Sequence, residues 1–134
     1  MKITSSISRY LLGFIFLVFG LNGFLNFIPM PPPTGLAGQY MGALFMSHFL
    51  VLIFLLQIVP AVLLLANLFV PLALVLLGPV VVNILCFHAF MAPSGFPLAV
   101  IVAVLWFLTY LSVRPSFAGI FDARVQSRNE QVRP

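Results

Sequence analysis

Apolar residues form four long runs along the chain, separated by short segments rich in proline, glycine or asparagine. The runs predict helices at residues 7–28, 44–66, 71–90 and 96–113. Each is close to the roughly 20 residues that an α-helix needs to cross the hydrocarbon core of a bilayer. None has the polar outer stripe of a soluble bundle, and none alternates polar and apolar residues as membrane strands do. The pattern predicts an all-α protein, an integral membrane bundle of four transmembrane helices.

The segments between the runs contain residues that end helices. Residues 29–33 read Pro-Met-Pro-Pro-Pro, which cannot continue a helix because proline lacks an amide donor and fixes φ. We expect residues 34–42 to form a loop or an interfacial turn. Residues 67–70 predict a tight connection, and Pro-Ser-Gly at 93–95 is typical of a turn. These boundaries predict one transmembrane domain, residues 1–121, followed by a polar basic tail, residues 122–134.

Composition and charge place this bundle in a membrane. The chain is 63% hydrophobic and 6% charged, whereas soluble domains carry about 25% charged residues. No Asp, Glu, Lys or Arg stands between Arg9 and Arg114, and a charge at the bilayer centre costs roughly 2.5–3.5 kcal/mol. A soluble enzyme and a disordered chain are therefore excluded. The net charge of +4 lies at the two ends, where we expect it to meet the lipid bilayer and its anionic headgroups, not nucleic acid.

The basic residues also predict an orientation. Lys2 and Arg9 flank the first span, and four arginines follow the last one: Arg114, Arg124, Arg128 and Arg133. Cytoplasmic segments of membrane proteins are enriched in Lys and Arg. Both termini are therefore expected on the cytoplasmic side, which requires an even number of spans. The connection between the second and third spans has no basic residue, so this orientation depends on the termini alone.

Polar side chains inside the spans are the candidate functional residues, because each needs a hydrogen-bond partner in lipid. With a helix rise of about 1.5 Å per residue, polar groups from three helices fall in the outer half of the bundle. They predict an outward-opening ligand pocket beneath residues 29–33. The alternative is that the amides only bond between helices, worth about 0.6 kcal/mol on average, while the histidines lie at the interface. The residues concerned are Asn22, Asn26, His48, Gln57, Asn83 and His88.

Other features of the spans indicate packing. Gly13, Gly20 and Gly23 recur on the first span like the small residues of close helix contacts. Trp106 and Tyr110 are interpreted as anchors at the inner interface. The spans contain no carboxylate, and the one cysteine, Cys86, excludes an internal disulfide framework. The sequence thus offers no catalytic set and no metal-ligand set, and we expect no catalytic activity from the chain alone.

Four segments in order resemble the DoxX-like family of small bacterial four-helix membrane proteins: residues 9–24, residues 57–72, residues 78–88 and residues 117–121. The resemblance implies a four-helix bundle in the bacterial plasma membrane and association with redox partners. The chain departs from patterns common in that family at three positions. Asn22-Gly23 replaces a lysine near the end of the first span, Gln57 replaces a glutamate, and Asn67 replaces a basic residue.

Three functional hypotheses remain. The first is a non-catalytic subunit or scaffold for a membrane protein partner, including a redox partner. The second is a binding site for a hydrophobic ligand such as quinone, formed by the six polar residues named above. The third is a small transporter acting as a homo-oligomer, since four spans are few for a pathway within one chain.

Overall fold

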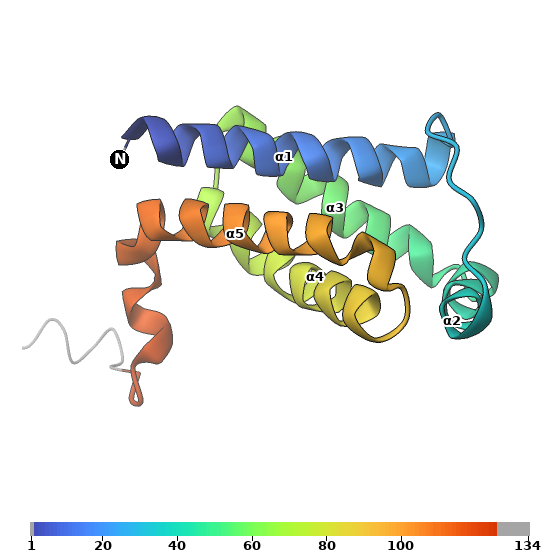
Figure 1. Cartoon of the computed structure of the whole chain (residues 1–134). Helices are drawn as coiled ribbons and strands as arrows, with labels where there is room; N and C mark the ends of the chain where they lie inside the picture. The colour runs from blue at the N-terminus through green and yellow to red at the C-terminus, as the bar shows by residue number, and fades with distance from the viewer. Residues whose placement is uncertain (1, 126–134) are drawn as a thin grey trace, which may run out of the picture.

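The apolar runs fold into long helices that pass back and forth beside one another (Figure 1). The computed structural model describes residues 2–125. The long helices are α1 (Lys2–Leu25), α3 (Phe49–Ala66), α4 (Val70–Phe90) and α5 (Phe96–Val113), and the short elements are α2 (Gly35–Met46) and the 3₁₀ turns η1 (Pro93–Gly95) and η2 (Arg114–Phe121). Within the described residues, the four long helices are long and apolar enough to cross a membrane. For α5, this span includes the flanking turns η1 and η2.

Left-handed residues set several of the helix boundaries. Asn26 has φ 50° and follows the end of α1, while its backbone N–H donates to the carbonyl of Asn22 at 2.9 Å. Asn67 and Phe69, with φ 55° and 49°, form the tight turn between α3 and α4. Asparagine tolerates this conformation better than most residues, so it is a common helix stop. The first helix therefore ends at Leu25, three residues before the predicted boundary.

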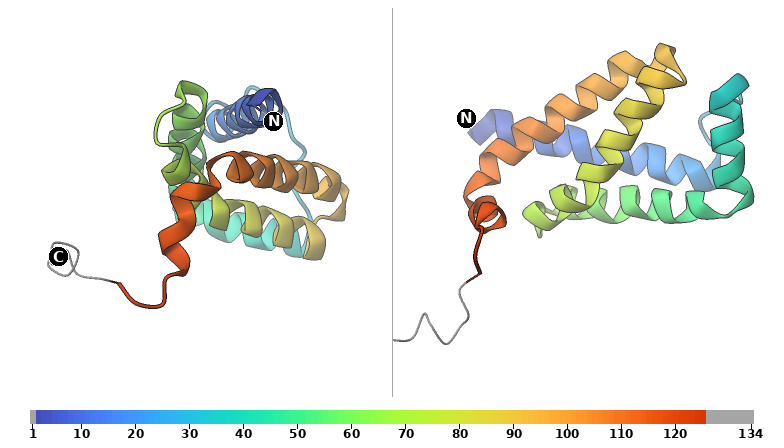
Figure 2. Two further views of the ribbon diagram at one scale, coloured as in Figure 1. Left: turned by 90° about the vertical axis from the view of Figure 1, so that its left-hand side faces the viewer. Right: turned by 90° about the horizontal axis from the view of Figure 1, so that it is seen from below.

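The segment after the proline cluster was predicted wrongly. Residues 34–42 were expected to form a loop or turn, but residues 35–46 form the helix α2. His48, with φ 60°, interrupts the helical conformation before α3 begins at Phe49. The predicted span 44–66 is therefore divided between α2 and α3. Figure 2 shows α2 lying crosswise to α1 and α3 at one end of the bundle. This end is called the α2 end below, and the opposite end, where α1 begins and α5 ends, the terminal end.

The four long helices form a ring in which α1 contacts α3 and α5, and α4 contacts the same two helices. The main cluster of buried apolar side chains lies at mid-bundle and toward the terminal end. Among them are Leu12 and Phe16 of α1, Leu64 of α3 and Leu74 of α4. The core therefore holds the terminal end together, while α2 contributes only Ala37 to the buried apolar residues.

The glycines of α1 lie at a close helix contact, as predicted, and the helix that they face is α3. A Cβ atom on Gly13 would lie 3.0 Å from Leu65 Cγ, and one on Gly20 would lie 2.7 Å from Ile58 Cγ1. A Cβ atom on Gly23 would overlap the ring of Phe54. Because a larger residue would separate the two backbones, these glycines allow the close approach of α1 and α3.

Two polar side chains link helices toward the terminal end. Arg9 was expected to flank the first span, but it lies inside α1, is only 9% exposed and donates to the carbonyl of Leu64. The indole N–H of Trp106, a residue interpreted as an interface anchor, donates to the carbonyl of Leu74 at 3.0 Å and so joins α5 to α4. Residue type alone did not predict either of these bonds to a backbone carbonyl on a neighbouring helix.

Candidate functional site

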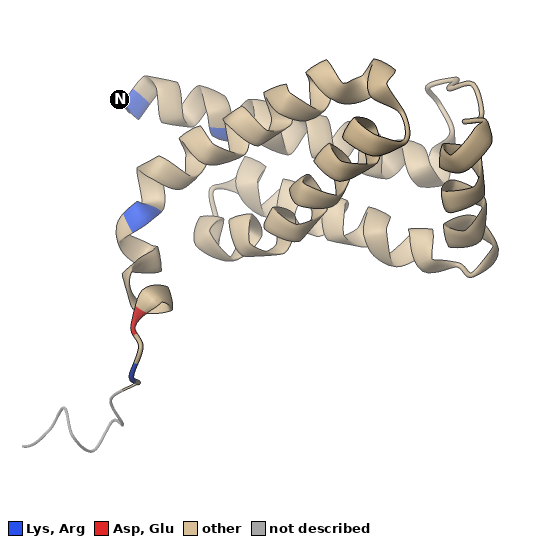
Figure 3. Cartoon of the chain, turned by 60° about the horizontal axis from the view of Figure 1, so that its bottom comes forward, with Lys and Arg blue, Asp and Glu red and all other residues tan. Residues whose placement is uncertain are grey.

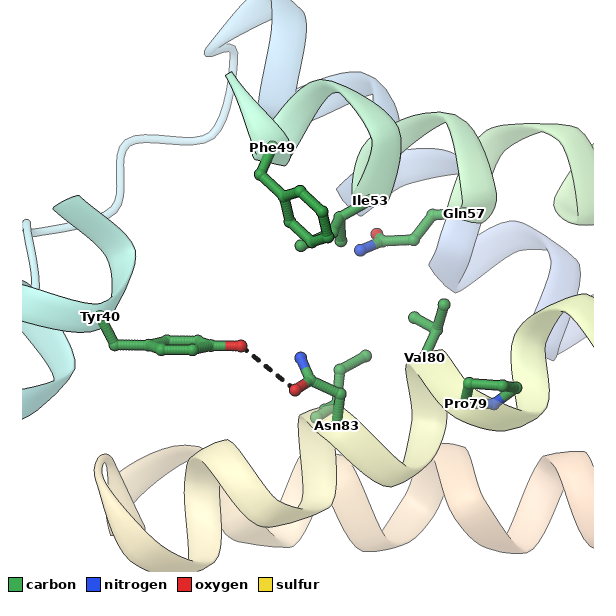
Figure 4. A pocket seen from close by; sticks show the side chains of 8 residues that line it. Tyr40, Phe49, Ile53, Gln57, Pro79, Val80 and Asn83 are labelled. Atoms are coloured by element: carbon green, nitrogen blue, oxygen red, sulfur yellow. Dashed lines mark hydrogen bonds between the residues drawn. The ribbon is translucent and has the colours of Figure 1, made fainter. Parts of the chain in front are cut away.

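A cavity lies between α2, α3 and α4 at the α2 end of the bundle (Figure 4). Its volume is about 180 Å³, and it is open on one side. Most of its lining is apolar, and polar side chains enter it from each of the three helices. The lining residues are Tyr40, Phe49, Ile53, Gln57, Pro79, Val80, Asn83 and Ile84.

Gln57 is the main polar group of the cavity. It lies on α3, is 8% exposed and makes no side-chain hydrogen bond within residues 2–125. No fully buried side-chain nitrogen or oxygen in the described part of the chain lacks a partner. The Gln57 amide is therefore reached from the cavity, and Figure 4 shows it pointing into that space. An amide in apolar surroundings is stabilised by any molecule that completes its hydrogen bonds.

Asn83 and Tyr40 lie on the opposite wall. The Tyr40 hydroxyl donates to Asn83 Oδ1 at 3.2 Å, which ties α2 to α4 (Figure 4). The Tyr40 ring also packs against Phe87, with centroids 5.7 Å apart. Because Oδ1 of Asn83 accepts this bond, its Nδ2 stays available as a donor. The cavity thus presents amide donors from two helices, with Phe49 and Ile53 as apolar surroundings.

The proline in the middle of α4 contributes to the shape of this site. Pro79 lines the cavity and cannot donate a backbone hydrogen bond within α4. A proline inside a helix loosens or kinks it, because its ring also displaces the carbonyl four residues earlier. Pro79 therefore stands where α4 forms one wall of the opening next to α3.

The structure brings only two of the six predicted residues, Gln57 and Asn83, to this cavity. Asn22 is buried and closes the end of α1: its Oδ1 accepts from the Ile28 N–H at 2.7 Å, and its Nδ2 donates to the Ile28 carbonyl at 3.4 Å. Asn26 is the left-handed residue after α1 and is exposed. Both asparagines help to set the backbone conformation at the end of the first span.

The two histidines lie outside the cavity lining. His48 is the exposed left-handed residue between α2 and α3. His88 Nδ1 lies 3.0 Å from the carbonyl of Ala92. The His88 ring also covers Gly95, where a Cβ atom would overlap it. His88 therefore packs against the turn that joins α4 to α5.

Sequence reasoning missed Tyr40 as a site residue. The segment that contains it was expected to be a loop, so its side chain had no predicted place relative to the spans. The available signal was a run of small and apolar residues after the proline cluster, which is compatible with a short helix. The apolar wall residues Phe49 and Ile53 could not be distinguished by sequence from the many apolar residues that face lipid.

No family model, no curated protein and no solved structure matches this chain. The resemblance to the DoxX-like family therefore gains no support from these comparisons and stays a prediction. The four long apolar helices define the class of protein: this chain is a small multi-pass membrane protein.

Proposed function

We propose that this membrane protein binds an amphipathic small molecule whose head carries carbonyl oxygens, of which a quinone is the representative. The observation that supports the proposal is the Gln57 amide, which is 8% exposed and faces a cavity without a partner in residues 2–125. Its Nε2, together with Asn83 Nδ2, offers N–H donors to two carbonyl oxygens. Ligand sites commonly combine an apolar lining with a few such polar groups.

The size of the cavity limits the ligand. At about 180 Å³ it is smaller than drug-sized pockets, which occupy roughly 300–1,000 Å³. Benzene fills an engineered cavity of about 150 Å³ in another protein. The cavity therefore matches one six-membered ring, and an isoprenoid tail would leave through the open side into lipid. This match favours a single-ring quinone head over a fused-ring or haem-sized ligand.

Equilibrium binding of a tritiated benzoquinone with a short isoprenoid tail tests the proposal. The full chain is purified in mild detergent, and partition into empty micelles is subtracted. We expect Gln57→Leu and Asn83→Ala each to weaken binding about tenfold, equivalent to about 1.4 kcal/mol. Gln39→Leu is the matched control, since Gln39 is an exposed amide on α2 outside the cavity lining. Unchanged affinity in both cavity variants would overturn the quinone site.

The same preparation tests the other predictions about assembly. A subunit or scaffold would co-purify with a defined membrane or redox partner, whereas a transporter would need a homo-oligomer.

We also propose a bacterial plasma membrane location with both termini cytoplasmic. Its support is that the basic residues in the described chain lie toward the terminal end (Figure 3). Reporter fusions at the two termini that gave opposite sidedness would contradict it. The basic residues Arg128 and Arg133 lie outside the described residues.

A further inference from the structure

Arg9 is a buried cation whose charge has no acidic partner in the bundle. The chain has two acidic residues, Asp122 and Glu130, both in the segment after the last span. No salt bridge of Arg9 is present within residues 2–125. Its hydrogen bond there goes to the Leu64 carbonyl, and its Cζ lies 4.3 Å from the centroid of the Tyr10 ring. Taking a cation out of water is expensive unless an opposite charge or several acceptors compensate it.

The guanidinium has donors left over. Of its three nitrogens, Nη1 donates to the Leu64 carbonyl. Since no fully buried side-chain nitrogen in the described residues lacks a partner, Nε and Nη2 reach the molecular surface. Nε and Nη2 therefore contribute to the 9% exposure of Arg9, next to the Leu64 carbonyl of α3 to which Nη1 donates. Arginine in this geometry suits the oxygens of a phosphate group.

The position of Arg9 along α1 matches the depth of lipid headgroups. The residues before it include Lys2, Thr4 and three serines, and the residues after it are apolar up to Leu21. A helical side chain also leans toward the N-terminus of its helix, so the guanidinium is directed to the polar side of this boundary. Half-exposed Tyr10 lies at the same level, as tyrosines do at membrane interfaces.

We propose that Arg9 and the adjoining end of α3 form a binding site for a phosphate group, supplied by an anionic phospholipid at the terminal end of the bundle. The Leu64 carbonyl holds the guanidinium in place, and the phosphate oxygens accept from Nε and Nη2. This site is separate from the cavity at the α2 end and does not depend on the quinone proposal. Free phosphate offers the same oxygens, so the experiment includes it.

Thermal unfolding of the full chain in mixed micelles tests this site. The midpoint is measured with added phosphatidylglycerol, with added phosphatidylcholine and with inorganic phosphate. We expect phosphatidylglycerol to bind at least tenfold more tightly than phosphatidylcholine. Arg9→Gln should reduce this preference to within twofold, and Arg9→Lys should retain part of it. Arg124→Gln, which removes an exposed arginine of the tail, should leave it unchanged.

The lipid dependence separates a phosphate site from a purely structural bond. If Arg9 only fastened α1 to α3, Arg9→Gln would lower the midpoint equally in both lipids and keep the tenfold preference, which would overturn the proposal. If Arg9→Gln does not fold, the lipid preferences of Arg9→Lys and of the wild type test the proposal instead. Equal affinity of the wild type for both lipids would overturn the proposal. Stabilisation by inorganic phosphate at equal concentration would support the phosphate site and assign its source to solution.

Discussion

The two faces of α3 show opposite relations to their neighbours. Toward α1, the backbones approach closely because Gly13, Gly20 and Gly23 leave no side chain between the helices. Toward α4 and α2, the same helix borders an open cavity into which Gln57 points. The first face is suited to holding the bundle together, and the second to receiving a molecule. One apolar helix thus combines a packing face with a binding face, and mutations on the two faces should have different consequences.

The strongest test of the packing face is Gly20→Val. A Cβ atom there would lie 2.7 Å from Ile58 Cγ1 and 3.2 Å from Gln57 Cβ, so the Ile58 side chain or the two helices must shift. We expect a loss of about 2–3 kcal/mol of stability, in the range of overpacked cores, measured by thermal unfolding in detergent. Gly42→Val is the control, because a Cβ atom at Gly42 would meet no atom within 4 Å. Equal stability of the two variants would show that the protein's stability does not depend on close packing of α1 against α3.

Asn22→Ala tests a polar group whose hydrogen bonds are completed within the chain. Its amide serves both the N–H and the carbonyl of Ile28, and the substitution leaves these part-buried backbone groups without partners. The expected loss of stability is about 1–2 kcal/mol, measured by the same unfolding assay. Asn26→Gly should change stability by less than about 0.5 kcal/mol, because glycine readily adopts the left-handed conformation of Asn26. An Asn22→Ala variant as stable as the wild type would contradict the role of Asn22 in closing the end of α1.

Gln57→Leu should increase the stability of the ligand-free protein, whereas the two preceding substitutions decrease it. Gln57 has no hydrogen-bond partner in residues 2–125, so replacing its amide by an apolar group of similar size removes a desolvation penalty. We expect the ligand-free protein to gain about 1 kcal/mol while losing affinity for the quinone. Thermal unfolding without ligand measures the first effect. A clear loss of stability would show that Gln57 is a packing residue like those on the other face of α3.

The smallest effect is expected for Tyr40→Phe. The change removes the 3.2 Å bond to Asn83 but keeps the ring that packs against Phe87. We expect about 0.5–1 kcal/mol less stability and a quinone dissociation rate up to about threefold faster, since α2 is held less firmly beside the cavity. Tyr110→Phe is the control, because the Tyr110 hydroxyl makes no hydrogen bond in the described part of the chain. An unchanged dissociation rate would mean that α2 does not retain the ligand.

The sequence predicted the elements of the fold better than the site. Four apolar runs are sufficient to predict four long helices, because hydrocarbon demands length and low polarity. The segment around Tyr40 was misread because proline before a short helix resembles proline within a loop. Of the polar residues, Asn22 and Gln57 look equivalent in the sequence. Only the positions of neighbouring backbone groups show that Asn22 has partners within the chain and that Gln57 faces a cavity.

By itself, the amino-acid sequence determined that this chain has four helices suited to a bilayer, with its charges outside the long apolar stretch. The reason is that the transfer of charge and polar backbone into hydrocarbon is a local cost, counted residue by residue. The tertiary structure decided which side chains meet: Arg9 with the Leu64 carbonyl, Trp106 with the Leu74 carbonyl, and Gln57 opposite Asn83. These contacts depend on how apolar helices rotate and cross, and nearly uniform apolar surfaces contain little information about that choice.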